Sequence, residues 1–174
     1  EQPPNPARIL GVDPGLNITG YAVIEPREKR LHVCEAGVVR STQRRSLAYR
    51  VREIHDGLAE AIVSLKPAAM ALEALYSHYD RPRTSILMGH ARGVICLAAA
   101  EADIEVTSYN ATQVKLILTG NGRAPKSQMQ QAIRRELALT KLPEPADIAD
   151  ALAIALCHHY LAGKAKALKV AGKL

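Results

Sequence analysis

The stretch RILGVDPGLNITGYAVIEPREKRLHVCEAGVVR, residues 8–40, decides the fold class. It holds three segments rich in β-branched residues, 8–13, 19–25 and 31–40, and the links PGLNI and PREKR between them carry residues typical of turns. Because links this short join neighbouring strands, the pattern predicts an antiparallel three-stranded meander.

Beyond the meander, the chain alternates helices with strands. Apolar residues recur every three or four positions from Ser46 to about Lys66, which predicts an amphipathic helix that Pro67 ends. The remaining predicted elements are a buried strand at 68–75, an apolar helix at 84–102, a strand at 104–110, a helix after Asn110 as N-cap, a helix from Lys126 to Leu139 and a last helix from Ala146. From residue 68 onwards the pattern is that of an α/β protein.

The composition bounds the size and the partners of the protein. With 174 residues, 48% of them hydrophobic, the chain is predicted to form one globular domain over residues 8–163. A flexible lead-in at 1–7 and a basic tail at 164–174 that frays are expected on either side. The formal net charge of +6 suggests a polyanionic partner such as nucleic acid.

The three cysteines and the hydropathy point to a cytoplasmic protein. Cys34, Cys96 and Cys157 lie far apart in apolar runs and form no C-x-x-C pair, so we expect buried free thiols in a reducing compartment. No apolar run reaches the roughly 18 residues that a membrane span needs, and EQPPNPAR lacks the apolar core of a signal peptide. We therefore expect no membrane association.

Four acidic residues stand at positions where folding does not require them. Asp13 ends the first predicted strand, although Asp-Pro-Gly also suits the start of a turn. Glu73 interrupts an apolar strand, where a carboxylate is costly unless it is paired, metal-bound or at the open end of the strand. Asp147 and Asp150 lie about 60° apart at the head of the last helix, where capping calls for only one acid.

Together the four acids indicate a metal site. Converging carboxylates repel one another unless a cation neutralises them, and Mg²⁺ prefers a few carboxylate oxygens while it keeps water or phosphate in its other positions. Two such ions roughly 3.5–4 Å apart activate a water and stabilise the leaving oxygen in phosphodiester cleavage. We therefore predict that Asp13, Glu73, Asp147 and Asp150 are metal ligands.

Six motifs in order, GVDPGLNITGYAVIE, LEALY, ARGV, QVK, GNGRAPKSQ and DIADALAIALCHH, resemble the bacterial RuvC-type Holliday-junction resolvases over about 150 residues. The resemblance implies an RNase H-like fold, with a five-stranded mixed sheet and helices on both faces. It also implies a Mg²⁺-dependent, homodimeric, nucleoid-associated endonuclease of recombination and repair, which cuts four-way DNA junctions symmetrically with two ions per site, Mn²⁺ as a substitute and RuvA and RuvB as partners. The family's metal-binding acids match Asp13, Glu73, Asp147 and Asp150.

The same resemblance suggests residues that contact DNA. Lys115 and Lys126, each near the start of a predicted helix, are expected to hold the scissile strand, although either could be an ordinary solvated lysine. Tyr76 stands where the family commonly has a Phe thought to wedge into the junction, and Arg81 and Arg83 are expected to flank the junction centre. The family's pattern is not kept at Tyr76, at His90, where Gln is usual, or across 110–112.

Two features leave alternatives open. The apolar helix at 84–102 carries Gly89 and Gly93 on one face, so it is either buried between the sheet and other helices or packed against its copy in a dimer. Two rival functions also remain, a ribonuclease of the same fold that acts on RNA/DNA hybrids and a junction-binding protein without catalysis. The four intact acids disfavour the second, and GNGRAPKSQ disfavours the first.

Overall fold

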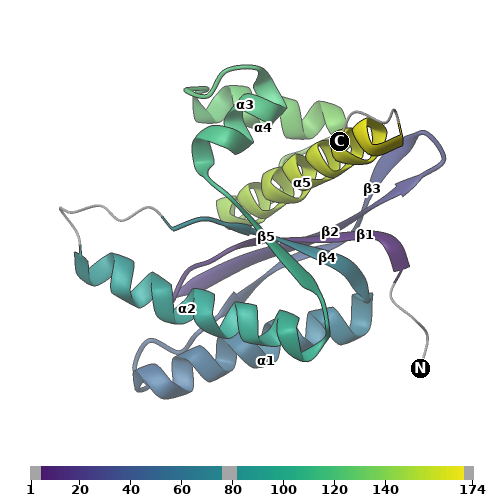
Figure 1. Cartoon of the computed structure of the whole chain (residues 1–174). Coiled ribbons are helices and arrows are strands. Elements are labelled where there is room, and N and C mark those ends of the chain that lie inside the picture. Colours follow the sequence, from purple (N-terminus) through teal and green to yellow (C-terminus); the bar gives the residue numbers. More distant parts are fainter. Residues whose placement is uncertain (1–4, 76–81, 171–174) are drawn as a thin grey trace.

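The computed structural model describes residues 5–75 and 82–170 and contains a five-stranded sheet with helices on both faces (Figure 1). The strands are β1 (Asn5–Asp13), β2 (Ile18–Arg27), β3 (Arg30–Arg40), β4 (Pro67–Glu73) and β5 (Glu105–Tyr109). The helices are α1 (Leu47–Leu65), α2 (Pro82–Glu101), α3 (Ala111–Thr119), α4 (Lys126–Glu136) and α5 (Ala146–Val170). Every predicted helix and strand is present, and Asn110 caps α3 by accepting a hydrogen bond from the N–H of Gln113.

The strand order is β3-β2-β1-β4-β5. The first three strands form the predicted antiparallel meander, whereas β4 pairs parallel to β1 and β5 pairs parallel to β4. This confirms the mixed sheet. Because β1, β4 and β5 run in the same direction, their carboxyl ends meet at one edge of the sheet, where Asp13, Glu73 and Tyr109 are the last strand residues.

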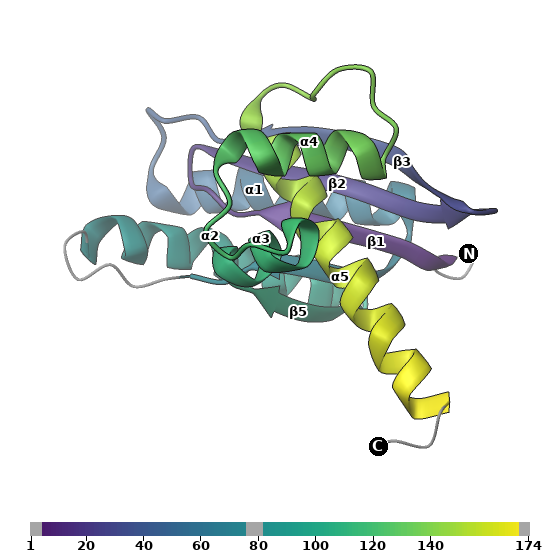
Figure 2. The same cartoon turned by 90° about the horizontal axis from the view of Figure 1, so that it is seen from above.

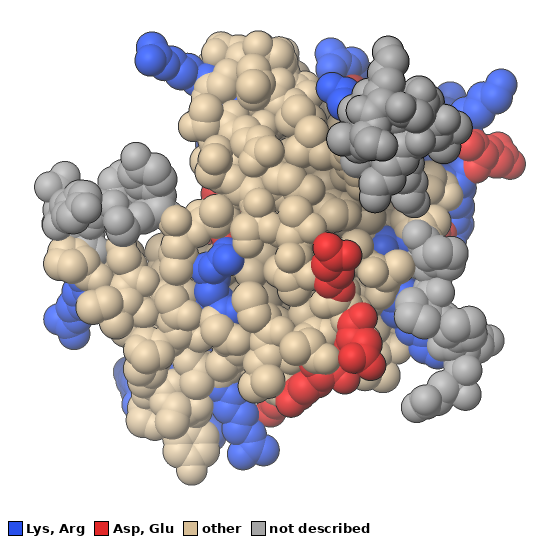
Figure 3. All heavy atoms as spheres, viewed as in Figure 1, with Lys and Arg blue, Asp and Glu red and all other residues tan. Residues whose placement is uncertain are grey.

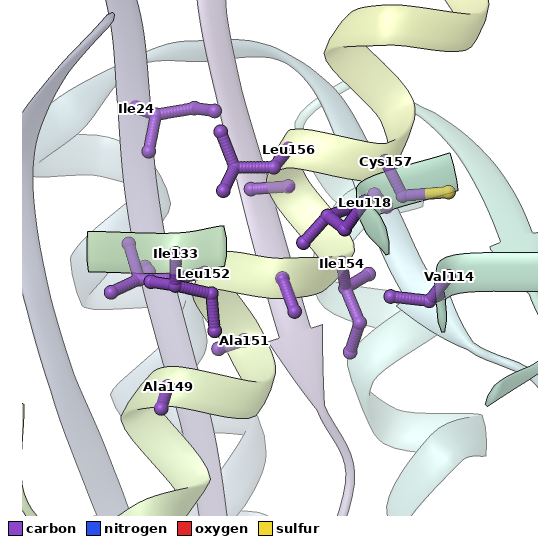
Figure 4. Close-up of a cluster of buried hydrophobic side chains, with 14 of the residues drawn as sticks. Ile24, Val114, Leu118, Ile133, Ala149, Ala151, Leu152, Ile154, Leu156 and Cys157 are labelled. Atoms are coloured by element: carbon purple, nitrogen blue, oxygen red, sulfur yellow. The ribbon is translucent and has the colours of Figure 1, made fainter. Parts of the chain in front are cut away.

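Alternate residues of the strands feed two separate cores. Leu10, Val12 and Leu72 point toward the layer of α1 and α2, where Ile54 and Leu58 complete a fully buried cluster. On the other face, strand residues such as Ile24 pack against α5, and α3 and α4 cover that helix (Figures 1 and 2). Figure 4 shows this second core, with Ile24, Val114, Leu118, Ile133, Ala149, Ala151, Leu152, Ile154, Leu156 and Cys157 among its members.

Helix α5 lies unusually close to the sheet. A Cβ atom on Gly11 of β1 would stand 2.2 Å from the carbonyl oxygen of Ala151 and 2.8 Å from the Cβ of Ala155. Only glycine permits this approach, because any larger residue would push the helix away. The small side chains of β1 and α5 therefore set the height at which the start of α5 meets the edge of the sheet.

The element ends differ from the sequence prediction by three residues or more in three places. Strand β1 starts inside the expected lead-in, because Asn5 pairs with Pro67, and α5 continues to Val170 through the tail expected to fray, where alanine and lysine favour helix. Helix α4 ends at Glu136 rather than Leu139, since Ala138 adopts a left-handed conformation with φ of 51°.

The three cysteines are free thiols that differ in burial. Cys157 is buried as predicted, whereas Cys34 and Cys96 are half-buried, and all three are free. No helix within residues 5–75 and 82–170 is both long and apolar enough to span a membrane.

Candidate active site

Asp13 and Glu73 lie side by side at the carboxyl edge of the sheet. They follow Val12 and Leu72, which are partners in the parallel register of β1 and β4. Burial, followed by the charge of Glu73 and a hydrogen bond with it, raises the pKa of Asp13 to about 8, and Asp150 and Asp147 add to this rise. Burial also raises the pKa of Glu73. The two carboxyls thus form a pair that resists carrying two negative charges.

The start of α5 brings the other two acids to the same edge. Asp147 lies in the first turn, and its main chain packs on Gly20, the residue opposite Asp13 in the β1–β2 register. Asp150 follows one turn later. Burial and then the charge of Asp147 raise the pKa of Asp150, whereas Lys126 lowers it. Asp13, Glu73 and Asp150 thus each feel the charge of at least one other predicted acid, although the four acids come from three separate elements.

A cavity of about 280 Å³ opens where these elements meet. Asp13, Glu73 and Asp150 line its acidic side, and Lys115 and Lys126 belong to its lining as well. Gln130 and apolar residues of α3, α4 and α5 supply the rest. Asp147 is not among the lining residues. The cavity thus joins three of the predicted acids to both predicted lysines.

The two lysines are placed to receive an anion. The positive charge of Lys115 lowers the pKa of Glu73, and that of Lys126 opposes the raised pKa of Asp150, so each lysine lies near one acid. Lys126 is also the first residue of α4, where unpaired main-chain N–H groups favour negative charge. Elsewhere the basic charge is spread out: in Figure 3 the blue side chains occur around much of the outline, while red ones gather over the lower layer of α1 and α2. The surface charge in this view does not single out one region, whereas the cavity gathers both predicted lysines beside three of the predicted acids.

Comparison with known proteins now decides the family. The family model described as "Crossover junction endodeoxyribonuclease RuvC" matches residues 9–158. The chain belongs to the RuvC family. A protein of that name from Rhodopirellula baltica is 59% identical over 161 residues, covering 92% of this chain and 90% of the relative. Another from Heliobacterium modesticaldum is 44% identical over 149 residues, covering 86% of this chain and 91% of the relative.

Solved RuvC structures share the fold. The structure of Thermus thermophilus RuvC superimposes with a TM-score of 0.85 at 32% identity, covering 91% of this chain and 96% of that one. The same protein in complex with a Holliday junction substrate gives a TM-score of 0.85 at 31% identity, covering 90% and 94% of the two chains. The RNase H-like fold implied by the sequence motifs is therefore confirmed.

Membership of the RuvC family implies the use of a divalent metal, and the donor set agrees with it. Burial and the charge of neighbouring acids raise the pKa of Asp13, Glu73 and Asp150, and a hard cation would remove this repulsion. As they stand, the side chains do not form a closed coordination shell, because in residues 5–75 and 82–170 no group of three or more His, Cys, Asp or Glu is gathered closely enough to hold an ion. The fit therefore rests on the chemistry of the donors.

Of the remaining predicted DNA-contacting residues, the structure describes only Arg83. Arg83 is exposed in the first turn of α2 and is not part of the cavity lining, and Tyr76 and Arg81 lie outside the described residues. His158 accepts or donates a hydrogen bond with the hydroxyl of Tyr109 at 2.9 Å, and burial lowers its pKa. That contact joins α5 to the end of β5.

Sequence reasoning did not single out Arg92. Its guanidinium donates a hydrogen bond through Nη1 to the carbonyl oxygen of Glu73, and through Nη2 to the hydroxyl of Ser108 at 3.0 Å. A signal was present, because Arg92 is the cation of the ARGV motif in the middle of a nearly apolar helix. Gln130 and Met129 of α4, which also line the cavity, carried no such signal.

Proposed function

We propose that the protein is a structure-selective endonuclease that hydrolyses phosphodiester bonds in four-way DNA junctions. The supporting observation is the cavity that brings Asp13, Glu73 and Asp150 together with Lys115 and Lys126, in a chain of the RuvC family. Acids that hold a metal and cations that hold a phosphate are the two components that such a hydrolysis needs.

The acids hold the metal. Asp13, Glu73, Asp147 and Asp150 would bind two Mg²⁺ ions, with Mn²⁺ as a substitute. When bound, the metal supplies an activated water and neutralises charge on the leaving oxygen. The fold contributes the spacing, since β1 and β4 fix the first two carboxylates and the approach of α5 to Gly20 fixes the others.

Basic and aromatic residues hold the DNA. Lys115 and Lys126 are positioned to neutralise phosphates of the scissile strand and to keep them within reach of the acids. Tyr76, three residues after Glu73, is assigned to stack at the junction centre, and Arg81 and Arg83 to the neighbouring phosphates.

A homodimer accounts for two symmetric incisions. Helix α2 buries Ala91, Ile95 and Ala98 against the sheet, but its opposite side leaves Ile86 62% and Leu97 50% exposed. Apolar side chains exposed on the side of a helix that faces away from the core suit a contact with a second copy of the chain. The expected context is cytoplasmic, at the nucleoid, in recombination and repair with RuvA and RuvB.

One experiment tests this function against its rivals. Labelled four-way junction, linear duplex and RNA/DNA hybrid are each incubated with the protein in Mg²⁺ and in EDTA. The proposal expects paired incisions in the junction alone, and only with Mg²⁺. Cleavage of the hybrid would indicate a ribonuclease, and junction binding without incision would indicate a binding protein.

A further inference from the structure

Arg92 joins the ends of two parallel strands next to the acids. Its two hydrogen bonds go to the main-chain carbonyl of Glu73, the last residue of β4, and to the side chain of Ser108, the next-to-last residue of β5. The donor itself comes from neither strand but from α2, which packs beneath the sheet (Figure 1). One guanidinium therefore ties three elements together at the edge that carries the site.

The position from which Arg92 reaches this edge is fixed by the core. Its neighbours Ala91 and Ile95 are completely buried, so the helix cannot rotate or slide without disturbing the packing beneath the sheet. The guanidinium is planar and presents its donors in a rigid fork, which suits two acceptors at a set spacing. Arg92 thus acts as a strut of defined length and direction.

Glu73 needs such a support because the strand ends there. The last ladder contact beyond it is the N–H of Ala74, which donates to the carbonyl of Tyr109 at 2.8 Å, and residues 74 and 75 are in no regular element. The carbonyl oxygen of Glu73, in the same peptide unit, accepts the bond from Arg92 of α2. The main chain at Glu73 is therefore held from both sides, by β5 and by α2.

We propose that Arg92 is a positioning residue that holds the main chain of Glu73 so that its carboxylate stays directed into the cavity shared with Asp13 and Asp150. The proposal rests on the proposed function, in which Glu73 is a metal ligand. Arg92 itself touches neither metal nor substrate in this role. It does for Glu73 what groups behind a metal ligand generally do, which is to fix its orientation.

A positioning role and a purely electrostatic role of Arg92 predict opposite changes in metal affinity when Arg92 is replaced. If Arg92 acted only through its charge, it would repel a divalent cation, and removing the charge would tighten metal binding. If it positions Glu73, removing it frees the ligand and weakens metal binding, by about 10-fold to 100-fold for supports of this kind. The direction of the change in metal affinity therefore separates the two roles.

The test measures Mn²⁺ binding to the full chain by electron paramagnetic resonance of the free ion. Wild type is compared with Arg92→Met, which keeps the aliphatic stem, with Arg92→Lys, and with Arg52→Met as a matched control. Arg52 is an exposed arginine of α1, paired with Asp56 at 3.3 Å. We expect Arg92→Met to weaken Mn²⁺ binding by about tenfold or more, Arg92→Lys to fall between, and Arg52→Met to match wild type. Junction binding in EDTA and the thermal midpoint should stay near wild type in all three.

Two outcomes for a folded Arg92→Met protein overturn the proposal. One is an unchanged or tighter Mn²⁺ affinity in Arg92→Met. The other is a loss of junction binding in EDTA, which would make Arg92 a phosphate contact. If Arg92→Met does not fold, the proposal is tested with Arg92→Lys and Ser108→Ala. Ser108→Ala removes one acceptor of Arg92 and keeps the charge. Wild-type Mn²⁺ affinity in both variants overturns the proposal. If the Asp13→Asn protein binds Mn²⁺ as tightly as wild type does, the proposed metal site itself is refuted.

Discussion

The carbonyl oxygen of Asp147 lies 2.1 Å from the point that a Cβ atom on Gly20 would occupy. Gly20 is also the residue that faces Asp13 across β1 and β2. The absence of one side chain on β2 therefore sets how closely the acidic start of α5 approaches the acid at the end of β1. The spacing of the predicted acids therefore depends on this contact.

Gly20→Ala should damage the site through this contact. The added methyl group must displace the first turn of α5, and a shift of about 1 Å in a reacting group can cost about 100-fold in rate. We expect single-turnover cleavage of a four-way junction to fall by at least about tenfold, together with a lower thermal midpoint. Gly163→Ala is the matched control. Nothing lies within 4 Å of a Cβ there, and alanine favours helix, so its midpoint should not fall. Wild-type rates in Gly20→Ala would contradict the packing argument.

Asp147→Asn should separate cutting from binding. In the proposed function the acids hold metal and the lysines hold DNA, so the neutral amide would remove a ligand and leave the cationic residues in place. Cleavage in Mg²⁺ should be abolished, and junction affinity measured in EDTA should be equal to or higher than that of wild type because one negative charge is lost. Retained cleavage would remove Asp147 from the site.

Lys115→Ala should change the salt dependence of binding. Each phosphate contact contributes about −0.9 to the slope of log binding constant against log salt, so losing Lys115 should flatten the slope by about one contact. Fluorescence anisotropy with a labelled junction over a range of NaCl concentrations gives the slope. Lys29→Ala, in the exposed turn between β2 and β3 at the opposite end of β1, should leave it unchanged. An unchanged slope in Lys115→Ala would return that lysine to ordinary surface charge.

The fold could be predicted from sequence because its signals are local. The links after residues 13 and 25 are too short for anything but neighbouring strands, and the periodicity of 46–66 fits only a helix. The first and last residues of the helices and strands were harder to predict. Where β1 starts depends on Pro67, more than 60 positions away, and where α4 ends depends on the left-handed Ala138. Both are set by tertiary contacts that no short window contains.

For the candidate site too, some features could be predicted from sequence and others could not. A carboxylate such as Glu73 in an apolar strand is conspicuous because burying it is costly, so chemistry alone selected the acids. Their exact arrangement was not accessible, since Asp150 lines the cavity whereas Asp147 packs at Gly20. Arg92 escaped prediction because its acceptors are a main-chain carbonyl and a serine on two strands, 19 and 16 positions away. Nothing in the residue types of those acceptors marks them.

The stability of the sheet should depend on pH through Glu25. This residue is only 4% exposed on β2, and it accepts a hydrogen bond from Arg8 at 2.7 Å and another from Arg27. The bond from Arg8, more than that from Arg27, lowers the pKa of Glu25 below its ordinary value, against the opposing effect of burial. Because the folded-state pKa is lower than the unfolded-state value of about 4.3, the contribution is present above that value and is lost as the pH falls through the folded-state pKa. Denaturant unfolding of wild type and Glu25→Gln should therefore give a difference in unfolding free energy that is constant from about pH 7 to 5 and shrinks below about pH 4. Glu28→Gln, in the exposed turn nearby, should show no such difference, and a gap between wild type and Glu25→Gln that persists at the lowest pH would mean that Glu25 stabilises the sheet by packing rather than by its charge.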